Sequence, residues 1–250
     1  MGKIIAISGG EIGRPGFKIE TEEIDKEIIR LSNKRNPKLL FIPTASNDNQ
    51  EYIDVINNYF GKRLGCEVDT LYLIEKEISE TEIRKKILSS DIIYVGGGNT
   101  KKMLEVWKSK NVDTILKKAY EKNIILSGIS AGAICWFEKG CSDSVEYKLD
   151  DNPTSFLEIS GLNFIRGVLC PHFNVERARE EGLENIVKNT SNIGLALDNC
   201  VAIEIVGDEF RIIKSKETAR VYKSYWDKGK YKKELIENNN FIKLTHLYKK

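Results

Sequence analysis

The residues that build disulfide frameworks and metal sites are scarce in this chain. Among its 250 residues there are five cysteines and two histidines. The cysteines are odd in number and scattered, without a C-x-x-C pair: Cys66, Cys135, Cys141, Cys170 and Cys200. This pattern argues against a disulfide framework and against a zinc site. We therefore expect no metal, no cofactor and a location in the reducing cytoplasm.

Long apolar runs and an excess of one charge are also missing. No segment reaches the ~18 apolar residues of a membrane span, and the chain opens on a strand pattern rather than a signal segment. Lys plus Arg total 39 and Asp plus Glu total 37, and both signs are interleaved even in the lysine-rich C-terminal part. These absences argue against a membrane protein and against a nucleic-acid-binding surface.

The first two-thirds of the chain alternate short apolar runs with amphipathic stretches. Strands are predicted at residues 3–8, 38–42, 67–73, 91–95 and 124–127. Helices are predicted at residues 22–34, 49–64, 80–88, 101–109 and 112–122. Such alternation indicates βαβ units. We expect an α/β fold in one domain, residues 1–250, with a mostly parallel twisted sheet flanked by helices.

The last third of the chain has a different character. Residues 201–206 and 209–214 flank a Gly-Asp pair and read as a β-hairpin. Residues 219–226 look like a further strand. We expect an antiparallel C-terminal extension of the same sheet rather than a separate domain.

A nucleophile-elbow pattern stands at residues 128–133, which read Gly-Ile-Ser-Ala-Gly-Ala after an apolar run. A strand that ends in a strained, Gly-flanked turn and enters a helix lifts the central side chain out of the sheet. Ser130 is that central residue. The pattern is short, so a strand-to-helix turn that happens to carry serine is the competing interpretation.

A serine hydroxyl becomes a good nucleophile when a base takes its proton, and histidine is the usual base. His172 follows the apolar run 164–169 and precedes a helical pattern, so it also lies where a strand is expected to end. His246 lies in a polar segment five residues from the C-terminus. We expect His172 to be the base; the alternative is a structural histidine.

A second Gly-rich turn, residues 96–100, follows the strand predicted at 91–95. Its backbone N–H groups can approach a ligand closely, as an oxyanion hole requires. We expect Gly97, Gly98, Asn99 and Ala131 to border the substrate, with the amides of Gly98 and Ala131 as the donors. A phosphate loop is disfavoured, because no G-x-x-x-x-G-K-[S/T] pattern occurs. The turn after the first strand likewise lacks the G-x-G-x-x-G spacing of a dinucleotide loop.

These motifs together resemble the peptidase E family, which includes aspartyl dipeptidase and cyanophycinase. The resemblance is carried by residues 42–46 (IPTAS), 94–100 (YVGGGNT), 128–133 (GISAGA) and 171–173 (PHF), in the family's order. It implies a fold similar to class I glutamine amidotransferases, with Ser130 as nucleophile and His172 as base. It also implies short peptides with an acidic N-terminal residue, or isopeptides of aspartate, as substrates. Serine at the elbow, where those amidotransferases carry cysteine, points to a peptidase.

The carboxylate that would complete a Ser-His-acid triad is less well defined. Asp198 stands where family members carry an acid after a short strand, and it is preferred here. Cyanophycinase-like relatives carry Glu one place further on, where this chain has Asn199. Asp143 is the alternative acid, since members of the dipeptidase branch have been assigned an aspartate in that segment.

The sequence thus favours a serine exopeptidase that cleaves dipeptides or other short peptides. A non-catalytic peptide-binding protein on the same scaffold and a small-molecule esterase remain as alternatives. An acidic substrate would need a cation, and five candidates lie near the expected site: Arg14, Lys139, Arg166, Arg177 and Arg179. We expect a small peptide as the partner; the sequence leaves open whether the chain forms a homodimer.

Overall fold

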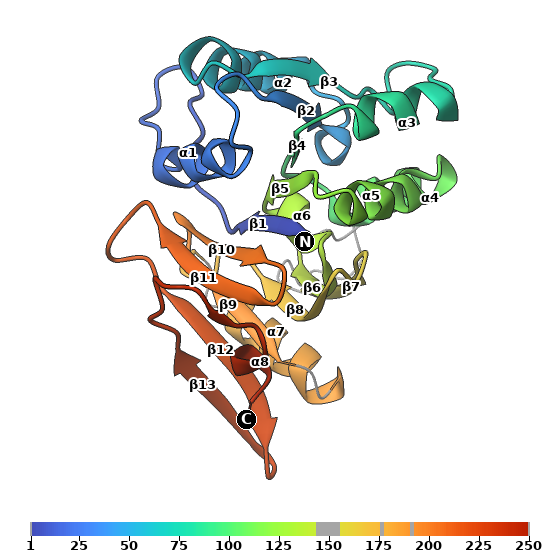
Figure 1. Cartoon of the computed structure of the whole chain (residues 1–250). Coiled ribbons are helices and arrows are strands. Elements are labelled where there is room, and N and C mark those ends of the chain that lie inside the picture. The colour runs from blue at the N-terminus through green and yellow to red at the C-terminus, as the bar shows by residue number, and fades with distance from the viewer. Residues whose placement is uncertain (1, 144–155, 176–177, 191–192, 250) are drawn as a thin grey trace.

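The computed structural model describes residues 2–143, 156–175, 178–190 and 193–249 (Figure 1). Its larger sheet has eight strands in the order β14-β11-β10-β1-β5-β4-β2-β3. Five of them are parallel: β1 (Lys3–Ile7), β2 (Lys38–Ile42), β3 (Glu67–Thr70), β4 (Ile92–Val95) and β5 (Ile125–Ile129). The predicted parallel α/β core is therefore confirmed, with strand boundaries shifted by up to three residues.

Helices cover both faces of the parallel strands, which explains why those strands are apolar throughout. On β1, Ile5 and Ile7 pack with α1 (Glu22–Leu31), α2 (Gln50–Ile56) and the π-helical segment η2 (Asn57–Arg63). Ile4 and Ala6 face the opposite way, towards α3 (Glu80–Leu88), α4 (Thr100–Ser109) and α5 (Val112–Glu121). The helix predicted at 49–64 is thus one α-helix that continues as a π-helix.

The predicted hairpin is present and extends the larger sheet. Strands β10 (Val201–Val206) and β11 (Glu209–Lys214) pair antiparallel, and β10 pairs antiparallel with β1. The short β14 (Ile242–Lys243) adds to the edge beyond β11. The antiparallel extension of the sheet is therefore confirmed for this part of the chain.

The strand predicted at 219–226 does not join this sheet, and here the prediction was wrong. It forms β12 (Val221–Asp227) in a second sheet of six strands, ordered β13-β12-β9-β8-β6-β7. The other five strands are β6 (Phe137–Ser142), β7 (Leu157–Ser160), β8 (Ile165–Cys170), β9 (Gly194–Leu197) and β13 (Lys230–Leu235). Local pattern predicts strands but not which sheet they join, because that choice depends on long-range burial.

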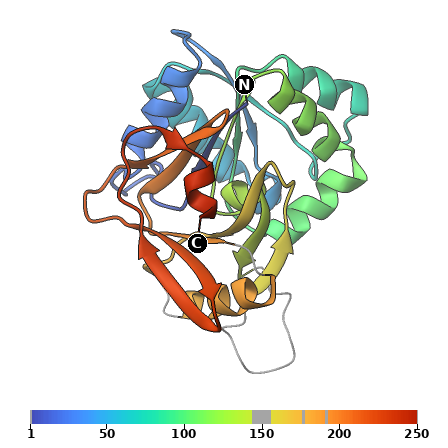
Figure 2. The same ribbon diagram turned by 60° about the horizontal axis from the view of Figure 1, so that its bottom comes forward.

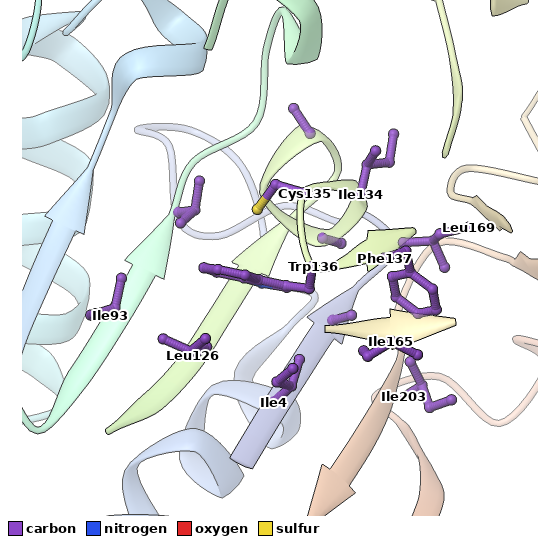
Figure 3. Packing of buried hydrophobic residues seen from close by; sticks show 14 of the residues in the cluster. Ile4, Ile93, Leu126, Ile134, Cys135, Trp136, Phe137, Ile165, Leu169 and Ile203 are labelled. Carbon is purple, nitrogen blue, oxygen red and sulfur yellow. The ribbon is translucent and has the colours of Figure 1, made fainter. Parts of the chain in front are cut away.

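The two sheets share one core. Trp136, just after α6 (Ala131–Ile134), is fully buried in the same cluster as Leu126 of β5 and Leu169 of β8. In Figure 3 its indole is seen across the strand that carries Leu126, with Phe137 and Ile165 on the right of it. The other face of the second sheet packs against α7 (Ala178–Thr190), through residues such as Leu183. Seen from below in Figure 2, α7 lies beneath that sheet, next to β12 and β13.

The carboxyl ends of strands from both sheets meet at one place. Beyond β1, Ser8 N–H donates to the carbonyl of Val201, and the Ser8 hydroxyl donates to the carbonyl of Leu197 at the end of β9. The amide of Cys200 donates to the carbonyl of Gly9. In open α/β sheets ligands bind at carboxyl ends of this kind, so the junction of the two sheets is where a site is expected.

Candidate active site

Ser130 sits in a strained turn between β5 and α6. Its backbone has φ 57° and ψ −113°, a conformation that L-residues rarely adopt. The two flanking glycines are required by close packing. A Cβ on Gly128 would lie 2.4 Å from the carbonyl oxygen of Gly132, and one on Gly132 would lie 2.2 Å from that of Val95. The structure therefore has the geometry that the elbow motif predicts, with the serine side chain held at the end of the sheet.

His172 reaches Ser130 from the second sheet. It follows β8, and its Nε2 lies 2.8 Å from the Ser130 hydroxyl oxygen. The backbone of His172 has φ 55°, and its N–H donates to the Ser8 hydroxyl at 2.7 Å. Because Ser8 also donates to the carbonyl of Leu197, it ties the histidine to the ends of β1 and β9. No sequence motif marks Ser8, because its hydroxyl only bridges two backbone groups.

The other ring nitrogen of His172 meets an amide side chain. Nδ1 lies 2.7 Å from Oδ1 of Asn199, and the Asn199 N–H donates to Oδ1 of Asn174. If Nε2 accepts the serine proton, Nδ1 carries a hydrogen and Asn199 Oδ1 accepts it, which fixes the tautomer a base requires. A neutral amide can orient the ring in this way, but it does not balance an imidazolium charge as a carboxylate would.

The preferred acid, Asp198, points elsewhere, so the expected contact with His172 is wrong by one residue. Its Oδ2 accepts the N–H of Arg220, and its own N–H donates to the Arg220 carbonyl, which fastens β9 to β12. Burial raises the pKa of Asp198 above its ordinary value. Adjacent residues at a strand end face opposite ways, so Asn199 turns to the ring while Asp198 turns to the neighbouring strand.

The alternative acid, Asp143, is also engaged away from the ring. Its Oδ2 accepts from Arg179 at 2.8 Å, and that guanidinium is buried on α7 above the ring of Phe156. Asp143 is itself largely exposed, at 63 % of its side chain. This ion pair holds the end of β6 to α7 rather than serving the histidine.

Gly9 is a site residue that the sequence did not reveal. A Cβ there would lie 2.3 Å from Asn199 Oδ1 and 2.3 Å from Cε1 of His172. Only glycine leaves room for the histidine–asparagine pair at the end of β1. Its signal in the sequence is the Gly-Gly pair after the first strand, which lacks the spacing of a dinucleotide loop.

The Gly-rich turn lies beside the elbow as expected. A Cβ on Gly97 would be 3.4 Å from Cβ of Ser130, and one on Gly98, with φ 138°, would be 2.1 Å from the carbonyl oxygen of Ala45. Asn99 caps α4, because its Oδ1 accepts the N–H of Lys102. Within the described residues no hydrogen bond uses the N–H of Gly98 or of Ala131, the two amides expected to act as donors.

The cysteines do not supply a rival nucleophile. All five are buried free thiols. Burial raises the pKa of Cys135, and contact with Cys141 together with burial raises the pKa of Cys170, so both thiols are held protonated. Over the described part of the chain, no group of three or more His, Cys, Asp or Glu side chains could hold a metal ion. None of the described helices is both long and apolar enough to span a bilayer.

A cavity of about 830 Å³ opens beside the elbow. Its lining comes from the loop after β1, from α2 and from the end of β5: Gly10, Glu11, Ile12, Gly13, Arg14, Pro15, Phe17, Asn49, Glu51, Tyr52, Asp54, Val55, Asn58 and Ile129. Three of these adjoin the site. Gly10 follows Gly9, Ile129 precedes Ser130, and the hydroxyl of Tyr52 accepts the N–H of Gly97 at 3.5 Å. The cavity is large enough for a short peptide.

Comparisons with known proteins agree with this architecture. The sequence model of Peptidase family S51 matches residues 4–213. A relative from Bacillus subtilis, named uncharacterized peptidase YgaJ, is 34% identical over 227 residues, covering 89% of this chain and 92% of the relative. A second, uncharacterized peptidase PM1590 from Pasteurella multocida, is 28% identical over 73% of this chain and 87% of its own length.

Solved structures show the same fold. A peptidase from an acI-B1 Actinobacterium superposes with a TM-score of 0.72 at 20% identity, covering 97% of this chain and 96% of that one. A putative peptidase E protein from Listeria monocytogenes gives 0.62 at 21% identity, with 86% and 98% covered. The chain belongs to peptidase family S51, the peptidase E family, and is a serine-type peptidase.

Proposed function

We propose that this peptidase is an exopeptidase that cleaves dipeptides and other short peptides through an acyl-enzyme on Ser130. The observation that carries the proposal is the 2.8 Å contact between His172 Nε2 and a serine oxygen on a strained elbow. This distance lies within the reach that general-base catalysis needs. The cavity that opens beside the elbow supplies the space for the substrate.

The reaction proceeds in two halves. In the first, Ser130 Oγ attacks the peptide carbonyl carbon while its proton moves to His172 Nε2, and His172 then protonates the leaving amine. In the second, His172 takes a proton from water, the hydroxide attacks the ester carbonyl, and the proton returns to Ser130 as the acid product leaves. Asn199 Oδ1 holds Nδ1–H throughout, so the ring keeps the orientation and tautomer that both halves need.

The negative oxygen of each tetrahedral intermediate needs donors already in place. The amides of Gly98 and Ala131 fill this role. Ala131 follows the serine directly, and Gly98 follows Gly97, whose Cβ would lie 3.4 Å from that of Ser130. Neither N–H donates a hydrogen bond within the described residues. A single lost donor of this kind costs ~10²–10³ in turnover. The Gly98 amide is fixed by its neighbour, since the Asn99 N–H donates to the carbonyl of Ala45 at 2.8 Å.

A labelling experiment tests the nucleophile directly. A fluorophosphonate probe should modify the wild-type protein and leave Ser130→Ala unmodified. Ser109→Ala is the matched control, because its hydroxyl donates only to the Val106 carbonyl at the end of α4. Labelling of Ser130→Ala at the wild-type rate would place the nucleophile elsewhere.

A substrate panel tests the reaction. The panel contains Asp-X, isoaspartyl, neutral and basic dipeptides, longer peptides with blocked and free ends, and simple esters. We expect hydrolysis of free dipeptides that disappears in Ser130→Ala. Turnover of the esters alone, or of the blocked peptides in preference to the free ones, would overturn the exopeptidase assignment. The preference for Asp-X or isoaspartyl peptides that the family resemblance implies is one outcome of this panel.

A further inference from the structure

We propose that Tyr52 binds the peptide substrate, by donating a hydrogen bond from its hydroxyl to a peptide oxygen other than the attacked carbonyl. This inference rests on the proposed function, because it takes Ser130 as the residue that holds the reacting end of the peptide. In a dipeptide the accepting oxygen belongs to the terminal carboxylate or to a side chain, and both can accept from a neutral hydroxyl.

Tyr52 lies where the cavity meets the reacting serine. Its side chain lines the cavity together with Ile129, the residue before Ser130. Its hydroxyl oxygen lies 3.5 Å from the amide nitrogen of Gly97. A Cβ on Gly97 would in turn lie 3.4 Å from Cβ and 3.9 Å from Oγ of Ser130. Gly97 therefore adjoins both groups, and a peptide that enters the cavity from Ser130 passes the hydroxyl of Tyr52.

The ring of Tyr52 is held in place before a peptide arrives. It packs edge-on against Phe41, with the ring centres 5.1 Å apart and an angle of 68° between the planes. It also covers Gly96, where a Cβ would come within 2.9 Å of the ring carbon Cε1. The Tyr52 N–H donates to Oδ1 of Asn49 at the start of α2. Because the side chain is already ordered, it loses little conformational entropy when its hydroxyl binds a ligand.

The hydroxyl hydrogen of Tyr52 has no acceptor among the residues that the structure describes. In this part of the chain the hydroxyl makes one hydrogen bond, in which its oxygen accepts from the N–H of Gly97. That bond uses a lone pair and leaves the hydrogen to donate. Burial raises the pKa of Tyr52 to about 12, so the hydroxyl keeps its hydrogen at neutral pH. The partner that this group can take is therefore an acceptor, and oxygens are the acceptors that a peptide offers.

The contact with Gly97 is too long to be the main support of the Gly-rich turn. Its 3.5 Å lies beyond the roughly 2.7–3.2 Å of an ordinary N–H···O hydrogen bond. The turn has a firmer support in the amide of Asn99, which donates to the carbonyl of Ala45 at 2.8 Å. Hydrogen bonds at catalytic sites are often long in the free enzyme and shorten in the complex. The hydroxyl of Tyr52 thus fits a role in binding better than a role in holding the turn.

The described cations that were expected near the site are engaged with other groups. Arg14 also lines the cavity, but its Nε donates to Oε2 of Glu11 at 2.7 Å. The others are Lys139, paired with Glu158, Arg179, paired with Asp143, and Arg166, which lies 5.8 Å from the ring centre of Tyr248. Arg177 lies outside the described residues. The hydroxyl of Tyr52 is a donor that does not first have to leave such a partner.

Tyr52→Phe removes the hydroxyl and keeps the ring. For the dipeptide that wild type cleaves best, we expect KM to rise roughly tenfold and kcat to change by less than about threefold, because the bond is made equally in the ground state and the transition state. Calorimetry on Ser130→Ala protein, with and without Tyr52→Phe, should show the same roughly tenfold loss of affinity apart from catalysis. The thermal midpoint of each variant checks that it is folded.

Tyr120→Phe is the matched control. The ring of Tyr120 is also partly buried, but it stacks on Phe164 and lies against Gly2, before the amino end of β1 and outside the cavity lining. This variant should keep the wild-type KM and kcat. A rise of KM in Tyr120→Phe equal to that in Tyr52→Phe would overturn the inference, because the effect would not depend on the cavity.

The labelling rate separates a role in binding from a role in building the site. A fluorophosphonate with short alkyl groups reacts with Ser130 without filling the peptide site, so its rate constant should be the same in Tyr52→Phe as in wild type. Slower labelling, or a loss of kcat without a rise in KM, would overturn the inference and make Tyr52 a support of the catalytic groups. Failure of the proposed function would show differently, as wild-type protein that neither reacts with the probe nor cleaves any dipeptide.

A comparison of ligands identifies the accepting oxygen. Ala-Ala carries only the terminal carboxylate besides the attacked carbonyl, and Ala-ethylamide carries no oxygen but that carbonyl. A loss of affinity on Tyr52→Phe for Ala-Ala and not for Ala-ethylamide assigns the bond to the carboxylate. A loss confined to dipeptides with an oxygen-bearing side chain assigns it to that side chain. An equal loss for Ala-ethylamide, or no loss for any dipeptide, would overturn the inference.

Discussion

The two sides of the site are built differently. On the side of the larger sheet, Ser130 and the Gly97–Gly98 turn follow buried parallel strands, and their positions depend on glycines packed against backbone. On the side of the second sheet, His172 and Asn199 follow β8 and β9 and are held by side-chain hydrogen bonds through Ser8 and Asn174. One side is fixed by close packing and the other by a polar network.

The difference explains how well each side could be recognised. A turn that excludes every side chain except glycine leaves a mark in the sequence, because only one residue type fits. A polar network tolerates several residue types at each position, so Asn199 can stand where an acid was expected. The two sides of the site meet at Gly9. Close packing requires glycine at this position, as it does in the elbow, but here the glycine makes room for the hydrogen-bonded pair of His172 and Asn199.

The largest effect on turnover should come from removing Ser130 or His172, the pair of residues whose contact joins the two sides of the site. Ser130→Ala and His172→Ala should each lower kcat for the best dipeptide by roughly 10⁵–10⁶, and the double variant should be no worse than either alone. The groups act as a unit, since the base serves only the nucleophile. Steady-state kinetics over the three variants checks this. If the loss of kcat in the double variant equalled the product of the two single losses, the two sides would act independently.

The next largest effect on kcat/KM should come from Gly9→Ala, a substitution at the place where the two sides of the site meet. The added methyl group would lie 2.3 Å from both Asn199 Oδ1 and His172 Cε1, so the pair must move away from Ser130. A misplacement of about 1 Å costs on the order of 10² in rate. We expect at least that loss in kcat/KM, with the thermal midpoint much less affected.

Gly61→Ala is the control for this substitution. Its Cβ would meet the side chain of Val68 at 3.5 Å, which is ordinary contact distance. Both variants should fold, and kcat/KM should fall only in Gly9→Ala. Full activity in Gly9→Ala would mean that the histidine does not need the position it has in this structure.

Smaller effects on kcat/KM should distinguish the roles of Asn199 and Asp198, the two adjacent residues that follow β9. Asn199→Ala removes the acceptor of His172 Nδ1–H and should cost about 10- to 100-fold in kcat/KM, the worth of one partly buried hydrogen bond to a reacting group. Asn199→Asp supplies a carboxylate that favours the imidazolium, so the acidic limb of the pH profile of kcat/KM should move to higher pH.

Asp198→Asn is the comparison for those variants. It keeps an oxygen for the Arg220 N–H, so kcat/KM should change by less than about threefold while the thermal midpoint shifts slightly. If Asp198→Asn impaired turnover more than Asn199→Ala did, the acid preferred from the sequence would regain its place beside the ring.

The smallest effect on turnover, but a clear one on stability, concerns Asp25, a fully buried carboxyl group on α1. Burial raises the pKa of Asp25 to about 7, although Thr21 and Tyr59 both donate to its Oδ2. Between its ordinary pKa and about 7 the folded protein holds a proton that the unfolded chain releases. The free energy of unfolding should therefore fall as pH rises through this window, by up to about 1.4 kcal/mol per pH unit.

Denaturant unfolding of wild type and Asp25→Asn from pH 4 to 8 isolates that contribution. Other carboxylates in ion pairs, such as Asp91 with Lys34, have a lowered pKa and give the opposite slope at lower pH. Subtracting the free energy of unfolding of Asp25→Asn from that of wild type cancels the contribution of these other carboxylates. We expect the advantage of wild type to decline from pH 4 to about 7 and then to level off. A difference that does not vary with pH would show that Asp25 is ionised in the folded protein.

Much of the larger sheet could be predicted from the chain itself. Its strands are apolar on both faces and alternate with helices, and α3 has the predicted bounds. The second sheet was not recognised as separate, because β12 has the same local pattern as the hairpin strands β10 and β11. The seven residues of β12 do not indicate whether this strand will pair with β9 or with β10.

The candidate site divides in the same way. The elbow, the Gly-rich turn and His172 were all recognisable, because each is a short pattern with a backbone requirement. The partner of His172 was not, since Asp198 and Asn199 are equally close in sequence and differ only in which way β9 points their side chains. Ser8 and Gly9 gain their meaning only when the ends of β1, β8 and β9 are brought together.

The sequence by itself determined a strained serine turn, a Gly-rich donor turn and a histidine at a strand end, since these depend on residue type and local conformation. The tertiary structure alone decided that two sheets, not one, build the site, that Asn199 faces the histidine, and that a cavity lies beside Ser130. Those outcomes follow from contacts between residues far apart in the chain, whose energies no local pattern records.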